Sequence, residues 1–441
     1  MKILFISPWD KKHGRYRSIL SFLIAYKPLT LPTLAALARR TVDAQIDVCD
    51  EMADNINKYN KHYDVVAISF ITPEASRAYK YAEMFRKRGS HVVLGGYHVL
   101  FNAEEAARHA DTVILGPGER SWSQFLQDFR DGNAKSLYEI SQPCASDYAT
   151  PDRSVLKSRR YVKYPTMIAT PSCRRNCSFC AICKMWETSY NTESASTAIA
   201  SSKYIDDIIA DMKAQKQKYF IFYDPNFFDD RSYAIKLMQA MKELNISWAG
   251  ATCIDIADDD ELLYWAKESG CAGLFIGFES LSAEALQNAD KAFNRPAEYK
   301  AAIAKIQSYG ISINGGFVIG MDGDTEETLL RIPAQIDELG LNLARFALLT
   351  PVPGSSLFNQ YKEAGRILSD DWGDYTQNCV VVKPQNMTPE RLTEIYFSIW
   401  KETYTWRRVF RRAFAVKTSS FYERLVCFFC NVGFKFLGRD M

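Results

Sequence analysis

The sequence predicts an α/β protein with two parallel β-sheets in succession. Three observations support this: short apolar, β-branched runs recur along the chain, amphipathic helical stretches separate them, and turn residues follow most of the runs. We expect a doubly wound domain first, then a partial barrel, and last a mainly helical C-terminal extension. The expected boundaries are 1–135 for the first domain, 136–162 for a linker, 163–365 for the barrel and 366–441 for the extension.

Five strands are expected in the first domain. They are apolar almost without interruption, which is typical of strands buried on both faces of a parallel sheet. Helical stretches at 31–40, 74–88 and 120–129 alternate with them, so the domain is predicted to be flavodoxin- or Rossmann-like. The expected strands are 2–6, 45–48, 64–69, 91–94 and 112–115.

Six further strands are expected in the second unit. The helices between them are amphipathic: in 204–215, Ile205, Ile208, Ile209 and Met212 fall on one face. Six βα units are short of the eight that close a TIM barrel, so we predict a TIM-like (β/α)6 barrel with one open side. The expected strands are 166–170, 219–223, 247–252, 273–278, 312–319 and 344–349.

Composition excludes several functional classes. The chain has 441 residues, 47% of them hydrophobic, and a net charge of +2, which gives no electrostatic case for nucleic-acid binding. No uncharged apolar run is long enough to cross a membrane, and the first residues lack the form of a signal peptide. Eleven cysteines without a secretory signal indicate reduced thiols, so we expect a cytoplasmic protein.

Three cysteines are the most informative motif. Cys173, Cys177 and Cys180 have the spacing C-x₃-C-x₂-C directly after an apolar run. Three thiolates on one loop can hold three irons of a [4Fe–4S] cluster and leave the fourth iron open for chemistry. The alternative is a tetrahedral zinc site with Cys183 as the fourth ligand, which the rest of the sequence makes the weaker interpretation.

This loop, including Phe179 before the last cysteine, resembles the signature of the radical S-adenosylmethionine (SAM) superfamily. The resemblance implies that the open iron binds the amino and carboxylate groups of SAM. It further implies that an electron from the cluster cleaves SAM and releases a 5′-deoxyadenosyl radical. A reducing partner such as flavodoxin or ferredoxin is then also implied.

The ends of the barrel strands resemble the same family in the segments FYDPNFFDD, GFES, GGFVIGMDGDTEET and LLTPVPGSSLF. Helix capping is a sufficient explanation for Asp324 and Thr325. It does not explain Glu279, a glutamate at the end of a strand. Gly323 departs from the family pattern, which often has an acidic residue there. The implied SAM contacts are Phe179 in the loop, Asp224 or Asn226 near the methionine amino group, Glu279 and Ser280 near methionine or ribose, and Gly316, Gly320 and Pro353 near adenine.

The first domain ends its strands in turns, VVLGGYHV and ADTVILGPGE among them, that together resemble a cobalamin-binding domain. The family's cobalt-ligating histidine follows the pattern Asp-x-His-x-x-Gly. Here Asp10 and His13 have another spacing, so we interpret His13 as a solvated loop residue and leave the lower cobalt ligand open. The implied cobalamin contacts are Ser69, Thr72, Gly95, Gly96, Tyr97, His98, Gly116, Gly118 and Glu119.

The C-terminal extension begins a helix at Thr388 and Pro389 and later becomes basic and aromatic over 406–414. Such a stretch either packs its aromatic side on the barrel, which we favour, or lies on an anionic membrane surface. Cys427 and Cys430 stand on an apolar face, where two cysteines are more often core residues than metal ligands. The roles of Cys183, Cys427 and Cys430 stay open.

Together these features predict a cobalamin-dependent radical SAM enzyme that C-methylates an unactivated carbon of a small molecule or lipid. The first alternative keeps the cofactors but gives a cyclisation, rearrangement or ring modification without methylation. A methylthiotransferase would need three more upstream cysteines, and only Cys49 and Cys144 are present. The alternative from another class is a non-catalytic binding protein held together by zinc. No catalytic side chain is assigned beyond the cofactor ligands.

Overall fold

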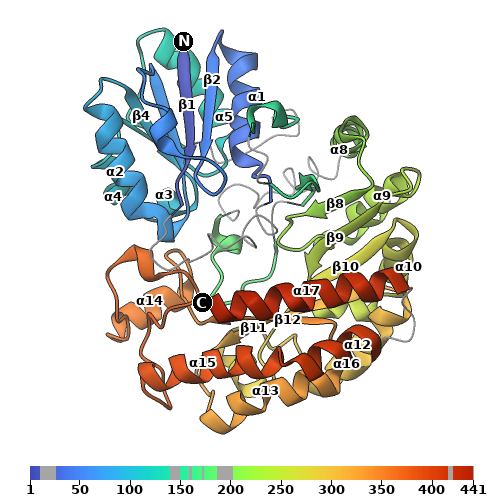
Figure 1. The fold of residues 1–441 in the computed structure, drawn as a ribbon. Coiled ribbons are helices and arrows are strands. Elements are labelled where there is room, and N and C mark those ends of the chain that lie inside the picture. The colour runs from blue at the N-terminus through green and yellow to red at the C-terminus, as the bar shows by residue number, and fades with distance from the viewer. Residues whose placement is uncertain are drawn as a thin grey trace.

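A computed structural model describes residues 1–9, 26–139, 149–157, 161–170, 173–185, 202–415 and 421–440. His13 and Cys144 lie outside these residues. Two six-stranded parallel sheets follow one another along the chain, and Figure 1 shows the first above the second. The expected α/β fold with a helical C-terminal extension is therefore confirmed.

The first sheet has the strand order β2-β1-β3-β4-β5-β6, the flavodoxin-like order with one strand added. Helices α1 and α5 cover one face, and α2, α3 and α4 cover the other. β6 follows the expected boundary at residue 135 and lengthens the sheet to residue 139. The elements are β1 (Lys2–Ser7), α1 (Thr30–Thr41), β2 (Gln45–Asp50), β3 (Val65–Ser69), α2 (Ala75–Arg86), β4 (His91–Gly95), α3 (Tyr97–Phe101), α4 (Ala103–Ala107), β5 (Thr112–Leu115), α5 (Gly118–Arg130) and β6 (Leu137–Glu139).

The second sheet has the order β12-β11-β10-β9-β8-β7, so its strands are neighbours in the sheet in the same order as in the sequence. Its two end strands, β7 and β12, are not paired with each other. This is the expected open barrel of six strands. The elements are β7 (Thr166–Met167), α8 (Ser202–Gln215), β8 (Tyr219–Phe222), α9 (Arg231–Lys242), β9 (Ser247–Thr252), α10 (Asp260–Glu268), β10 (Cys271–Glu279), α11 (Ala283–Asn288), α12 (Tyr299–Ser308), β11 (Ser312–Ile319), α13 (Glu326–Leu339), β12 (Leu343–Leu348) and α14 (Ser356–Glu363).

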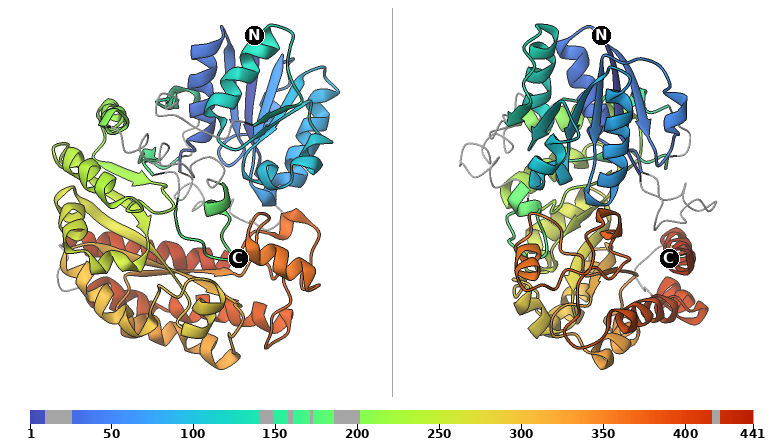
Figure 2. Two further views of the ribbon diagram at one scale, coloured as in Figure 1. Left: turned by 180° about the vertical axis from the view of Figure 1, so that it is seen from behind. Right: turned by 90° about the vertical axis from the view of Figure 1, so that its left-hand side faces the viewer.

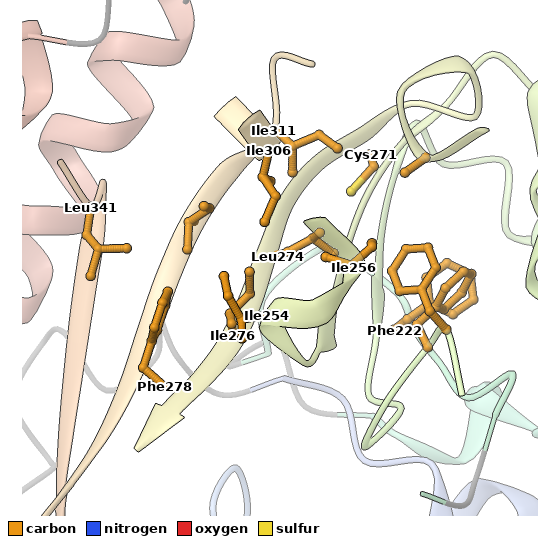
Figure 3. Packing of buried hydrophobic residues seen from close by; sticks show 14 of the residues in the cluster. Phe222, Ile254, Ile256, Cys271, Leu274, Ile276, Phe278, Ile306, Ile311 and Leu341 are labelled. Carbon is orange, nitrogen blue, oxygen red and sulfur yellow. The ribbon is translucent and has the colours of Figure 1, made fainter. Parts of the chain in front are cut away.

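Alternate residues of the barrel strands face an outer layer of helices and form the main core. Leu274, Ile276 and Phe278 of β10 are buried there with Ile306 of α12, as Figure 3 shows. The intervening residues of the same strands therefore lie on the opposite, inner face of the sheet. Side chains on this inner face that are accessible can contact a ligand bound inside the barrel.

Three helices complete the chain: α15 (Pro389–Thr403), α16 (Trp406–Ala415) and α17 (Phe421–Asp440). Thr388 caps α15 by accepting a hydrogen bond from the Arg391 N–H, with Pro389 in the first turn, as expected. Asn431 of α17 donates to the Asn342 carbonyl just before β12 (3.0 Å), so α17 packs on the barrel. None of the described helices combines the length and apolar character needed to span a bilayer.

The two units meet at the carboxyl ends of their strands. Trp372 donates its indole N–H to Glu105 of α4 (3.1 Å), and Thr166 of β7 donates to the Lys27 carbonyl (2.7 Å). Figure 2 shows α14 and the segment after it below the helices of the first sheet. Ligands of both sheets are expected at these ends, so the fold brings two candidate sites together.

Candidate functional site

The cysteine loop follows β7 and is fastened to the barrel by backbone hydrogen bonds. The Ser178 N–H donates to the Ala289 carbonyl after α11 (3.1 Å), and the Leu357 N–H of α14 donates to the Ser178 carbonyl (2.9 Å). Phe179 packs against Ala285, Ala289 and Met321. The loop is therefore held at the carboxyl ends of the barrel strands, the edge where barrel enzymes bind their ligands.

Of the three motif cysteines, Cys177 is buried and Cys173 and Cys180 are half-buried. Burial raises the pKa of the Cys173 thiol to about 12 and that of Cys177 to about 11, and it also raises the pKa of Cys180. Cys253, at the end of β9, lies near enough to affect Cys173 and Cys177 electrostatically. In the sequence, Cys253 has no metal-ligand spacing to the other cysteines. Only the fold shows that it lies near the motif.

This donor set fits a [4Fe–4S] cluster. Within the described ranges, no three Cys, His, Asp or Glu side chains converge on a point that would suit a single metal ion. A four-iron cluster makes no such demand, because each thiolate binds a different iron. Iron deprotonates a coordinating thiol, so the raised thiol pKa values do not oppose ligation.

An ion pair lies beside Cys177. Glu279 ends β10 at a shift in the β10–β11 register, with a positive φ of 61°, and its carboxylate accepts from the Lys291 ammonium at 2.7 Å. Lys291 is 5% exposed. Burial opposes its charge, but Glu279 and the nearby thiols outweigh burial and raise the Lys291 pKa. A non-glycine residue with this backbone conformation often marks a functional site.

The strand-end residues expected near methionine are tied into the barrel. The Asp224 Oδ1 accepts hydrogen bonds from the backbone of Ala169 (2.8 Å) and Thr170, while its Oδ2 is buried without a hydrogen-bond partner among the described residues. Burial raises the pKa of Asp224 to about 7. Asn226 accepts from the Thr252 hydroxyl (3.1 Å), and Ser280 accepts from the Ser282 N–H (3.0 Å). Their contacts with SAM stay predictions.

Protein side chains cover the glycines at the end of β11, and the expected contacts of these glycines with adenine stay predictions. A Cβ on Gly316 would lie 2.6 Å from the Phe275 ring, and one on Gly320, whose φ is 94°, would lie 2.6 Å from Leu392. Asp324 accepts from the Gly320 and Met321 N–H groups (2.9 Å each) and so shapes the turn after β11, while Thr325 caps α13. Pro353 is buried in the turn after β12.

The expected cobalamin residues gather at the carboxyl edge of the first sheet. Gly96 has a φ of 102°, and a Cβ there would lie 2.7 Å from the Phe70 carbonyl oxygen, so only glycine fits this turn. Thr72 and His98 are buried and face each other, with 3.3 Å between the Thr72 hydroxyl and His98 Nδ1. The other members are half-buried: Ser69, Gly95, Gly96, Tyr97, Gly116, Gly118 and Glu119.

An exposed apolar side chain and a half-buried aromatic residue lie at this edge. Ile71 follows β3 with 55% of its surface exposed, which offers apolar area where polar residues are usual. Leu357 of α14 donates to the Ser178 carbonyl of the cysteine loop, and Gly354, just before α14, lies against Phe101 of α3. Burial raises the pKa of Tyr97 in α3, and the nearby Cys180 thiol adds to this effect. The candidate cobalamin edge and the candidate cluster loop therefore adjoin each other, which sequence patterns alone could not show.

Comparisons with known proteins match both units of the chain. The family model of the Radical SAM superfamily matches residues 167–333, and that of the B12 binding domain matches residues 25–126. The first match contains the cysteine loop and the expected SAM residues up to Gly320. The second contains all the expected cobalamin residues.

Two curated relatives from Chlorobaculum tepidum match most of the chain. The bacteriochlorophyllide d C-12(1)-methyltransferase is 29% identical over 87% of this chain and 84% of its own, and the C-8(2)-methyltransferase is 28% identical over 88% of each. The radical S-adenosylmethionine methyltransferase TsrM from Kitasatospora setae, solved with cobalamin and a [4Fe-4S] cluster, is similar over 99% of both chains with a TM-score of 0.68. At 12% identity, the likeness to TsrM supports the fold alone.

Proposed function

Because this chain belongs to the radical SAM superfamily and carries a B12-binding domain, we propose that it is a cobalamin-dependent C-methyltransferase for an unactivated carbon of a small molecule. The observation that carries the proposal is that the segment after β12 contacts both candidate sites: Gly354 lies against Phe101 of α3, and Leu357 donates to the Ser178 carbonyl of the cysteine loop. Two cofactor sites around one space can hold a single substrate against both reactive centres.

When bound, the [4Fe–4S] cluster and SAM supply a radical, and cobalamin supplies the methyl group. In the proposed arrangement Cys173, Cys177 and Cys180 hold the cluster, and Phe179 keeps their loop on the barrel. The end of β11 is placed near the adenine of SAM. The half-buried turns after β4 and β5 hold the corrinoid.

The relatives favour methylation over the alternatives. Both Chlorobaculum relatives are methyltransferases, and they match nearly nine-tenths of this chain. The non-methylating use of the same cofactors is therefore not favoured. The zinc-held binding protein is not favoured either, because the radical SAM match spans the cysteine loop.

Anaerobic reconstitution with iron, sulfide, SAM and a reductant tests the proposal. The wild-type protein should form 5′-deoxyadenosine, and with hydroxocobalamin and bacteriochlorophyllide d as the probe it should give a product heavier by one CH₂ group. Cys177→Ala should abolish 5′-deoxyadenosine, whereas Cys271→Ala, which changes a buried cysteine at the start of β10, should keep it. Equal formation by both variants would refute the cluster assignment.

We further propose a protein electron donor of the flavodoxin or ferredoxin type and a cytoplasmic setting for the reduced cluster. Reduced flavodoxin or ferredoxin should replace the chemical reductant in the assay above. If neither supports 5′-deoxyadenosine formation, the electron-donor proposal fails.

A peripheral membrane contact is proposed for the exposed side of α16, where Trp406, Arg407, Phe410 and Arg411 are accessible. Phe429 of α17, 66% exposed, extends this apolar surface. The protein should sediment with vesicles that contain phosphatidylglycerol, and the double variant Trp406→Ser, Phe410→Ser should not. Equal sedimentation of the two proteins would remove this proposal.

A further inference from the structure

The inner face of the barrel sheet carries a cation with no ion-pair partner among the described residues. In β12, Ala344, Phe346 and Leu348 are buried in the core against the outer helices, so Arg345 lies on the inner face. Its side chain is exposed. Arg345 is paired in register with Gly316, and Gly316 with Gly277, so its neighbours across the sheet have no side chains.

An unsatisfied acceptor lies close to Arg345. Asn314 precedes Gly316 by two residues on β11 and shares the inner face with it. Its Oδ1 is buried and has no hydrogen-bond partner among the described residues. A buried oxygen without a partner is costly, so a ligand that donates to it would stabilise this part of the barrel.

Aromatic side chains flank this polar pair. Phe275 of β10 is 37% exposed and lies over Gly316. Tyr223, 45% exposed, follows β8 and forms an edge-to-face pair with Tyr26 at 5.7 Å between ring centroids. Arg345 is near enough to affect Tyr223 electrostatically, although burial and Tyr26 have the larger effects and raise the Tyr223 pKa. Strands β8 and β12 therefore face each other across the inner side.

We propose that Arg345 binds a carboxylate of the substrate and that the substrate is a ring-containing, largely apolar carboxylic acid. A guanidinium can pair with both carboxylate oxygens, and Glu279, the carboxylate that ends β10, already pairs with Lys291. Phe275 and Tyr223 provide flat apolar surface for the rings. The inference rests on the proposed methyltransferase function, because it assigns the substrate of that site.

The test compares each acid with its methyl ester, which keeps the rings and removes the charge. The probes are bacteriochlorophyllide d and 1-pyrenebutyrate, each with its ester, titrated into the reconstituted holoenzyme. Wild-type protein should bind at least one acid about 10- to 100-fold more tightly than its ester, the range of a charge-assisted hydrogen bond. Arg345→Gln should bind that acid and its ester alike, and Arg345→Lys should keep part of the preference.

Two controls separate this role from others. Arg331→Gln removes an exposed arginine of α13 and should keep the full acid preference. SAM affinity and SAM cleavage should be unchanged in Arg345→Gln. Weaker SAM binding would instead assign Arg345 to the SAM carboxylate and overturn the proposal.

Two further outcomes would also overturn it: a wild-type protein that prefers neither acid, and an Arg345→Gln variant that keeps the preference. Product mass is read separately. An Arg345-dependent acid preference without a methylated product would refute the proposed function while leaving the carboxylate site in place.

Discussion

The Glu279–Lys291 ion pair shows how single residues set the electrostatics around the cysteine loop. Both side chains are largely withdrawn from water, and their charged atoms are 2.7 Å apart. Gly277 permits this geometry, since a Cβ there would lie 2.3 Å from Glu279 Oε1 and 3.1 Å from Lys291 Nζ. The pair therefore depends on bare backbone beneath it.

Removal of Lys291 should destabilise the apoprotein strongly. Lys291→Met leaves the Glu279 carboxylate without its partner, so we expect the free energy of unfolding to fall by about 3 kcal/mol. Urea denaturation measures it. Lys305→Met, which breaks an exposed pair with Asp260, should cost less than about 1 kcal/mol. A similar small loss in both variants would contradict the importance of the buried pair.

At the same scale, sequence patterns identified one partner of this pair and missed the other. Glu279 stands at the end of an apolar strand, where an acidic residue is unusual and therefore indicates a functional role. Lys291 lies beyond α11 in a polar stretch that looks like ordinary surface. Lys291 comes next to Cys177 only because the chain turns back toward the cysteine loop after α11. No local sequence pattern predicts that turn.

At the scale of elements, β7 shows how a side chain can end a strand. The apolar run 166–170 predicted a five-residue strand, but β7 covers only Thr166–Met167. The Ala169 and Thr170 N–H groups donate to the Asp224 carboxylate, so strand pairing does not continue through them. Asp224 thereby fixes the chain just before the cysteine loop.

Asp224→Asn should change how stability depends on pH. An unfolded Asp has a pKa of about 4, whereas burial raises the Asp224 pKa to about 7. Between these values the unfolded chain releases a proton that the folded protein keeps, so this group lowers the free energy of unfolding as pH rises through the window.

Asparagine does not titrate, and its oxygen can still accept from the Ala169 N–H. The stability of Asp224→Asn relative to wild type should therefore increase by about 2.5 kcal/mol from pH 5 to pH 8. Denaturant titrations of both apoproteins at the two pH values measure it. A difference that does not vary with pH would show that Asp224 is not the buried acid described here.

The remaining strands were largely predictable because their two-sided burial leaves a nearly continuous apolar run. The expected 112–115, 247–252 and 312–319 coincide with β5, β9 and β11. β6 was missed, since Leu137–Glu139 is a short edge strand with only its middle residue buried. A pattern of three residues carries too little periodicity for detection.

At the scale of the whole molecule, the contacts between the two units decide whether both cofactor sites face one substrate. The Trp372 ring packs edge-on against His98 (5.2 Å between centroids) while its N–H donates to Glu105. Gly354, after β12, lies directly against Phe101 of α3. Local sequence patterns describe the surface of each unit, but they do not show which surface of one unit packs against the other. These contacts between the units could therefore not be predicted.

Gly354→Ala should separate radical formation from methyl transfer. Gly354 has a φ of 89°, and a Cβ there would lie 2.4 Å from the Phe101 ring, so an alanine must move the turn or α3. SAM cleavage needs only the barrel unit, although Gly354 follows Pro353, a proposed SAM contact, so some loss of cleavage is expected. Methyl transfer needs both units in place and should fall further. We expect 5′-deoxyadenosine to persist while methylated product falls about tenfold, the equivalent of a 1.4 kcal/mol loss in docking.

The matched control is Gly132→Ala, since Gly132 has a φ of 75° with no atom within 4 Å of the added carbon. Both variants incur the backbone strain of a left-handed alanine, about 1–2 kcal/mol, but only Gly354→Ala meets Phe101. Adding Phe101→Leu to Gly354→Ala should restore part of the methylated product, because the smaller side chain gives room to the new carbon. If Gly132→Ala lowers the product as much, or if Phe101→Leu restores nothing, strain alone explains the loss and the Gly354–Phe101 contact does not align the two sites.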